Sequence, residues 1–186
     1  TGAITINDGA LRVSGTNASI LGSGTVTVTA IGGGTIDSNQ AVQLSGGATV
    51  TNALTITGNA SGNSSGINFG GALQSVSVNN TWSGVITLST GPATICVDTG
   101  AILNLTSGTA ISGAFGLTLA GGGTGNINSV IGTGTGTLTK IGSGQWNLTA
   151  TNTFTGNIAV NAGTLALSGA AGALPAAGTA TLTVQP

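Results

Sequence analysis

Short apolar runs alternate with Thr, Ser or Asn along the whole chain, and Gly-rich segments separate one run from the next. The runs at 25–29, 41–44 and 164–167 are typical. Apolar side chains at every second position predict β-strands that bury one face, and the Gly-rich segments predict turns. No run has the 3.6-residue period of an amphipathic helix, and Gly recurs too often for a helix of more than a turn or two. The pattern therefore predicts an all-β protein with many short strands.

Two architectures accommodate many short, evenly spaced strands: an antiparallel sandwich or barrel, and a parallel solenoid in which each coil adds a strand to each sheet. An internal repeat favours the solenoid. Residues 1–32 align without a gap with residues 155–186, and twelve of the aligned positions are identical. Recurrence of one element at both ends is expected of a stacked array and not of a closed sandwich. We therefore expect residues 1–186 to form a single parallel β-helix, or β-solenoid.

The length of a coil sets the expected number of coils. At about 20 residues per coil, within the range of solenoid repeats, the chain would form about nine coils. Corners need residues that accept a positive φ, which favours Asn7, Gly9, Asn161 and Gly163 as turn residues. Alternation next to these corners gives the expected inward-stacking positions, which are Ile4, Ile6, Leu11, Val13, Ile158, Val160, Leu165 and Leu167.

Charge is almost absent from the chain. Only Arg12, Lys140, Asp8, Asp37 and Asp98 are charged among 186 residues, and there is no His, Glu, Tyr or Met. Such a composition occurs in low-complexity disordered segments as well as in repetitive β proteins. Disorder normally goes with low hydrophobicity and high net charge, whereas this chain is 39% hydrophobic and has a formal net charge of -1. The composition therefore favours a folded, repetitive core.

The same composition argues against several classes of function. Two basic residues cannot neutralise a nucleic-acid backbone, and one Cys without any His cannot build a metal site with nitrogen or sulfur ligands. No apolar run approaches the ~20 residues of a membrane-spanning helix. Glycoside hydrolysis would need a pair of carboxylates from Asp8, Asp37 and Asp98, and two cations make a poor clamp for a developing negative charge. We therefore expect no catalysis, cofactor or metal; a polysaccharide-degrading β-helix enzyme is the disfavoured alternative.

Three features bear on binding. Core packing is the expected role of the aromatic residues. An exposed platform for surface glycans is the alternative for Trp82, because residues 79–84 have the composition of a polar turn, where binding residues tend to lie. Thr at alternate positions in 25–29 and 179–183 would form a flat ladder suited to ice adhesion, although Thr is also a favoured strand residue. The single Cys96 cannot form an internal disulfide and is expected to pack as a small apolar side chain.

One segment, residues 136–169, combines several spaced marks. In order they are Leu138-Thr139-Lys140 followed by Gly142 and Gly144, Trp146, the run 152–156 and the run 161–165. In these marks the segment resembles the autotransporter-associated β-strand repeat of bacterial passenger domains, and the resemblance recurs in part at residues 1–15. The resemblance implies a right-handed parallel β-helix in an exported protein of the bacterial cell surface.

Together these observations predict a non-catalytic structural or adhesive β-solenoid that is secreted or lies at the bacterial cell surface. An ice- or carbohydrate-binding adhesin module is the alternative. Terminal coils of a solitary solenoid expose strand edges and normally need caps, and the sequence shows no capping helix. We therefore expect the ends to meet further solenoid, either in the parent chain or head to tail in a filament of copies. Because Thr1 is not preceded by a signal segment, we expect a processed product or an excerpt.

Overall fold

The computed structural model describes residues 2–17, 20–29, 40–57, 71–106, 111–168, 174 and 181–185. Within these residues the regular elements are β-strands, which form three sheets that we name A, B and C. Sheet A has the order β1 (Ile4–Ile6), β3 (Val26–Thr29), β6 (Leu54–Thr57), β9 (Ile86–Leu88), β12 (Ile111–Gly113), β15 (Ile131–Gly132). Sheet B has the order β2 (Ala10–Ser14), β4 (Ala41–Ser45), β7 (Leu73–Ser75), β10 (Ala93–Val97), β13 (Leu117–Gly121), β16 (Leu138–Lys140), β18 (Ile158–Val160), β20 (Leu182–Val184). Sheet C has the order β5 (Thr49–Val50), β8 (Asn79–Trp82), β11 (Ile102–Leu105), β14 (Thr124–Ile127), β17 (Gln145–Leu148), β19 (Thr164–Leu167).

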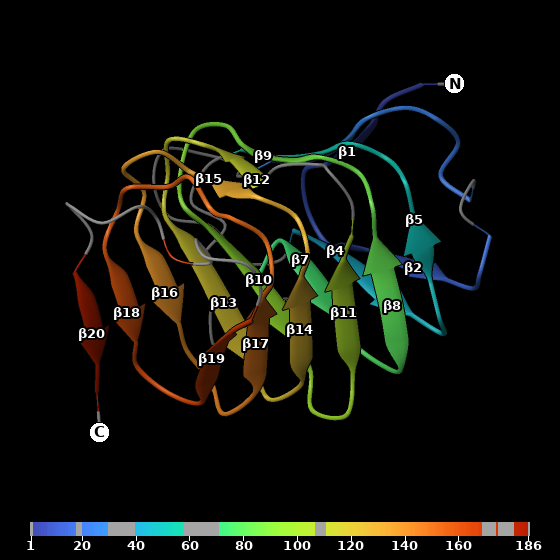
Figure 1. Cartoon of the computed structure of the whole chain (residues 1–186). Helices are drawn as coiled ribbons and strands as arrows, with labels where there is room; N and C mark the ends of the chain where they lie inside the picture. The colour runs from blue at the N-terminus through green and yellow to red at the C-terminus, as the bar shows by residue number, and fades with distance from the viewer. Residues whose placement is uncertain are drawn as a thin grey trace.

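The strand pairs in all three sheets are parallel. From β3 to β17 the chain visits sheets A, B and C in turn, so that β12, β13 and β14 stack on β9, β10 and β11 (Figure 1). The result is a β-solenoid of about six turns. The prediction of an all-β parallel solenoid is confirmed, and the antiparallel alternative is wrong. Among the described residues there is no helix of the length and apolarity needed to cross a membrane.

The predicted number of nine coils is wrong because the coils differ in length. Gln43 and Gln74 occupy the same place in successive turns and are 31 residues apart. Asn126 and Asn147, nearer the C-terminus, are only 21 residues apart. The difference lies in the length of chain between a strand of sheet A and the next strand of sheet B: 15 residues separate β6 from β7, and four separate β9 from β10.

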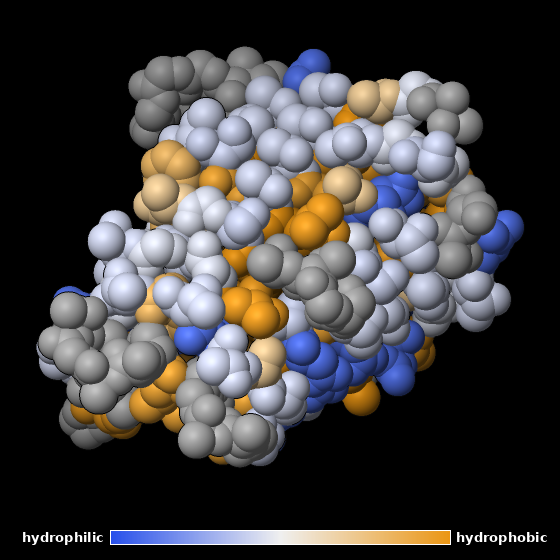
Figure 2. Space-filling view, turned by 45° about the horizontal axis from the view of Figure 1, so that its top comes forward, coloured by the Kyte–Doolittle hydropathy of each residue, from blue (hydrophilic) through white to orange (hydrophobic). Residues whose placement is uncertain are grey.

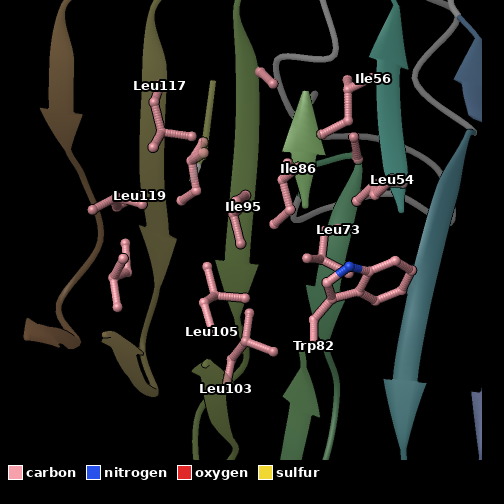
Figure 3. Close-up of a cluster of buried hydrophobic side chains, with 14 of the residues drawn as sticks. Leu54, Ile56, Leu73, Trp82, Ile86, Ile95, Leu103, Leu105, Leu117 and Leu119 are labelled. Carbon is pink, nitrogen blue, oxygen red and sulfur yellow. The ribbon is translucent and has the colours of Figure 1, made fainter. Parts of the chain in front are cut away.

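The core is a column of small apolar side chains enclosed by the three sheets. Figure 3 shows Leu54 and Ile86 of sheet A, Leu73 and Ile95 of sheet B and Leu105 of sheet C directed into the same interior. All five are at most 2% exposed. Because successive rungs are in register, each core side chain lies above a similar side chain of the previous turn, and the apolar area buried grows with every turn.

The predicted inward-stacking positions lie in this core with one exception. Ile6, Val13, Ile158 and Val160 are buried, and Ile4, Leu11 and Leu165 are partly buried and pack against the core. Leu167 lies in the predicted inward column but is 40% exposed. Leu167 stacks on Leu148 of β17, but β19 is the last strand of sheet C in the described residues and no further rung covers it.

The two halves of the internal repeat form the same local unit on different faces of the solenoid. Gly9 and Gly163 occupy equivalent corners with φ of 71° and 69°, and Asn7 and Asn161 each directly follow a strand. Yet β1 and β2 belong to sheets A and B, whereas β18 and β19 belong to sheets B and C. The strand, turn and strand geometry is therefore local to the sequence element, while the face that it occupies depends on the unequal coils between the two copies.

Candidate functional surfaces

The outward side of sheet A carries a ladder of hydroxyl side chains. Thr5, Thr27, Thr55, Thr87 and Ser112 face one another in successive rungs. Thr5 is exposed and the other four are half-buried, as expected for side chains that shade one another on a sheet surface. A second column begins with Thr29 and Thr57, which are in register two positions further along their strands. Hydroxyl and methyl groups therefore repeat on this face both from strand to strand and along the strands.

The outward side of sheet C carries a ladder of asparagine amides. The amide nitrogen of Asn147 donates to Oδ1 of Asn126 at 2.7 Å, and that of Asn126 donates to Oδ1 of Asn104 at 2.8 Å. Asn104 in turn donates to Oδ1 of Asn79. Asn104 and Asn126 thus each donate to the previous rung and accept from the next, so these hydrogen bonds run along the solenoid axis. Asn147 accepts from Gln145 of its own strand.

The outward side of sheet B carries a polar chain with a charge at each end. Arg12 Nη2 donates to Oε1 of Gln43 at 2.9 Å, Gln43 Nε2 donates to Oε1 of Gln74 at 2.9 Å, and Gln74 Nε2 donates to Asp98 Oδ1 at 2.8 Å. Both glutamines are only 4% exposed. Buried amides must find partners, and here each Gln satisfies the next, from the guanidinium of β2 to the carboxylate that follows β10.

Cys96 lies at the acidic end of this chain. The residue is buried, and its Sγ donates to Asp98 Oδ1 at 3.9 Å. Burial, and then the neighbouring Asp98 carboxylate, raise the pKa of the thiol to about 12. The thiolate is the reactive form of cysteine, so Cys96 is an inert packing residue in the folded chain.

Lys140 is a charged residue in an inward column of sheet B, in register with Leu119 and Val160. Its side chain is fully buried. Nζ donates to the carbonyl oxygens of Ile141 at 2.8 Å, Gly142 at 2.6 Å and Ala162 at 3.1 Å. Burial lowers the pKa of Lys140. The ammonium therefore ties the corner after β16 to the corner one turn later, and it is not available to a ligand.

Gly163 and Gly125 leave space for atoms of the neighbouring turn that pack against them. A Cβ at Gly163 would lie 2.4 Å from the Gly142 carbonyl oxygen and 2.8 Å from Lys140 Nζ. A Cβ at Gly125 would lie 2.2 Å from the indole of Trp146, whose Nε1 donates to the Ala120 carbonyl at 3.2 Å. The Lys, Gly and Trp marks of residues 136–169 are thus explained by corner and core packing.

The alternative of an exposed platform at Trp82 is wrong. Trp82 is 1% exposed and lies in register between Val50 and Leu105 in the core. Residues 79–82 form a strand, β8, and not a turn. Asn80 also faces inward, where its Oδ1 accepts from the Ala48 amide at 2.8 Å. Asn80 contributes to the polar, loop-like composition of the segment, although its side chain is buried and pairs with the backbone of the neighbouring turn.

The residues considered for catalysis do not form a site in the described part of the chain. Asp8 lies in the corner after β1, where its Oδ1 accepts from the Gly9 amide, and Asp98 ends the polar chain of sheet B. Asp37 and the second Thr tract's Thr179 lie outside the described residues. The described residues contain no group of three or more His, Cys, Asp or Glu suited to holding a metal ion. Sequence reasoning missed the Gln and Asn ladders because partners 21 to 31 residues apart leave no local signal.

Comparisons with known proteins agree with one part of the sequence analysis. Residues 138–167 match the family described as the passenger-associated-transport-repeat. The match lies inside the segment 136–169 that the sequence singled out, and it confirms that resemblance over these residues. Neither the search of curated proteins nor the search of solved structures found a match. The repeat and the solenoid together fit a structural module of an autotransporter passenger.

Proposed function

We propose that this chain, which carries a passenger-associated-transport-repeat at residues 138–167, is a non-catalytic spacer or adhesive rod of a bacterial surface passenger. One observation carries the proposal: the matched segment runs as ordinary rungs from β16 to β19 within a register-continuous parallel stack. A stack of this kind transmits its rigidity along the axis, because each turn donates backbone hydrogen bonds to the next. The function is thus the length and stiffness of the rod.

The absence of catalysis remains part of the proposal. In the described residues the outward amides of sheets B and C pair with each other, and the buried Lys140 and Cys96 are held in packing roles. Incubation of the folded chain with common polysaccharides and a reducing-end assay checks this directly. Release of sugar ends above a buffer blank would contradict it.

Further solenoid is the proposed partner at the C-terminal end of the stack. A hollow of about 250 Å³ lies there, lined mainly by apolar side chains that include Leu165, Leu167, Leu174 and Val184. Another rung, from the parent chain or from a second copy head to tail, would cover these side chains. Sedimentation over a wide concentration range distinguishes these two sources of the next rung. Assemblies that grow with concentration support a filament of copies, and monomers at every concentration refute the filament.

Surface location is tested on intact cells of the source bacterium. An antibody against the folded chain should label unpermeabilised cells, and external protease should remove the label while a cytoplasmic marker protein stays intact. Labelling that requires permeabilisation would contradict the proposal. The glycan-binding alternative has lost its support, because Trp82 is buried.

A further inference from the structure

The hydroxyls at the centre of sheet A differ from the outward amides of the solenoid. On sheets B and C the amides are paired with one another from turn to turn. The hydroxyls of Thr27, Thr55 and Thr87 make no hydrogen bond to any residue in the described part of the chain. They are half-buried, so they reach the surface without being covered by the described residues. This column therefore has its full hydrogen-bonding capacity left for something outside the protein.

The array repeats in two directions at fixed spacings. Along the axis, the in-register Thr residues of neighbouring strands lie about 4.8 Å apart, and along a strand the step from residue i to i+2 is about 6.6 Å. Thr27 and Thr29 on β3 and Thr55 and Thr57 on β6 supply both directions at once. The Thr57 hydroxyl also donates to the Val28 carbonyl oxygen at 3.3 Å. Ladders of identical side chains also hold a sheet flatter than its usual twist. A flat array with two regular periods fits a solid with a repeating surface better than one soluble molecule.

The side chains of this face indicate which kind of solid it could bind. No strand of sheet A carries a charged side chain, which removes the attraction that an ionic mineral would need. Figure 2, turned so that the side of sheet A comes forward, shows pale residues of intermediate hydropathy together with hydrophobic and strongly hydrophilic patches. A crystalline polysaccharide would favour exposed aromatic rings, yet Trp82 and Trp146 are buried. The face therefore best fits a solid whose surface is a lattice of neutral, hydrogen-bonding groups.

We propose that the outward face of sheet A, with Thr27, Thr55 and Thr87 at its centre, binds the surface of ice. Each Thr offers a hydroxyl that joins the water lattice and a methyl that orders the water beside it. This activity goes beyond the spacer role, and either can hold without the other. In a surface passenger, such a face would attach the rod, and whatever carries it, to ice.

The test compares one substitution on this face with the same substitution on another face. Thr55→Lys places a long charged side chain at the centre of the array. Thr139→Lys is the matched control, because Thr139 is a half-buried outward Thr of sheet B in register with Thr118 and Ala159, without a second Thr column. Circular dichroism and the melting temperature establish that both variants are folded; Thr87→Lys replaces Thr55→Lys if the latter does not fold.

The readouts are thermal hysteresis, ice-crystal shaping and partition of the fluorescently labelled chain into growing ice. We expect the unmodified chain and the Thr139 variant to bind ice to the same extent, and the Thr55 variant to lose most of the hysteresis and partition. Absence of all three effects from the folded unmodified chain overturns the proposal. Equal loss in both variants overturns it as well. Sedimentation with cellulose or chitin, without ice binding, would assign the face to a polysaccharide instead.

Discussion

Gly125 and Trp146 form a tight contact between two turns, which a single added methyl group can test. The two residues are in register on β14 and β17 of sheet C. A Cβ added at Gly125 would lie 2.2, 2.4 and 2.5 Å from three ring atoms of Trp146. Gly125 does not have a positive φ, so its backbone accepts Ala, and the collision with the ring is the main cost of the substitution.

The size of the effect follows from how little the ring can move. Trp146 is fully buried, and its Nε1 is held by the Ala120 carbonyl. Overpacking of a well-packed core costs about 1–3 kcal/mol, and contact with three ring atoms places Gly125→Ala at about 3 kcal/mol. Trp146→Leu alone should cost about 3–5 kcal/mol by analogy with large-to-small core substitutions. In the double variant the methyl occupies space that the indole has left, so the two losses should be less than additive by about 1–3 kcal/mol.

Urea unfolding followed by circular dichroism measures all three variants. Gly132→Ala is the control, because Gly132 also lies in a strand with no positive φ and its nearest neighbour would be Thr153 Oγ1 at 3.2 Å. The control should be close to neutral or slightly stabilising, since Ala restricts the unfolded chain. If Gly125→Ala were as mild as the control, or the two losses simply added, the stacking of Trp146 on Gly125 would be wrong.

Two further substitutions test the buried polar groups. Lys140→Met should cost about 1–3 kcal/mol in urea unfolding, because three carbonyl oxygens lose their donor; a variant as stable as the unmodified chain would refute the corner-tying role. For Cys96, the unfolded thiol titrates near 9 and the folded thiol has a pKa of about 12. The unfolded chain thus loses this proton first, and stability should fall between these pH values by about 1.4 kcal/mol per unit. Cys96→Ala should remove that part of the decline, and an unchanged pH profile would contradict it.

The fold class was predictable because its signals are local. Alternation within each run predicted strands, and Gly at corners such as Gly9 and Gly163 predicted turns with positive φ, which the structure has. The number of turns was not predictable, because it depends on which residues far apart in sequence come into register. Gln43 and Gln74 show this: nothing near either residue indicates that the next turn begins 31 residues later.

The direction of individual side chains was harder to predict where a polar residue faces inward. Trp82 seemed to belong to a turn because Asn79 and Asn80 precede it, yet Asn80 is buried and pairs with the Ala48 amide. Lys140 likewise lies in an apolar column because its ammonium reaches carbonyls beyond the column. For Asn80, and for the Lys140 contact to Ala162, the backbone of a neighbouring turn supplies the partner, which lies far from the residue in sequence.

One geometric fact explains why the three faces differ. Neighbouring rungs are about 4.8 Å apart, and a hydrogen bond needs a separation of at most about 3.2 Å between heavy atoms. An Asn or Gln amide carries a donor on one side and an acceptor on the other, so a column of amides bridges the rungs, as Asn104, Asn126 and Asn147 do. A Thr hydroxyl is a single atom on a short side chain and cannot span the gap to the Thr above it. The same stacking that pairs the amides of sheets B and C therefore leaves the hydroxyls of Thr27, Thr55 and Thr87 without a partner in the described residues. The binding proposal rests on sheet A because a second pair of threonines, Thr29 and Thr57, lies in register beside this column.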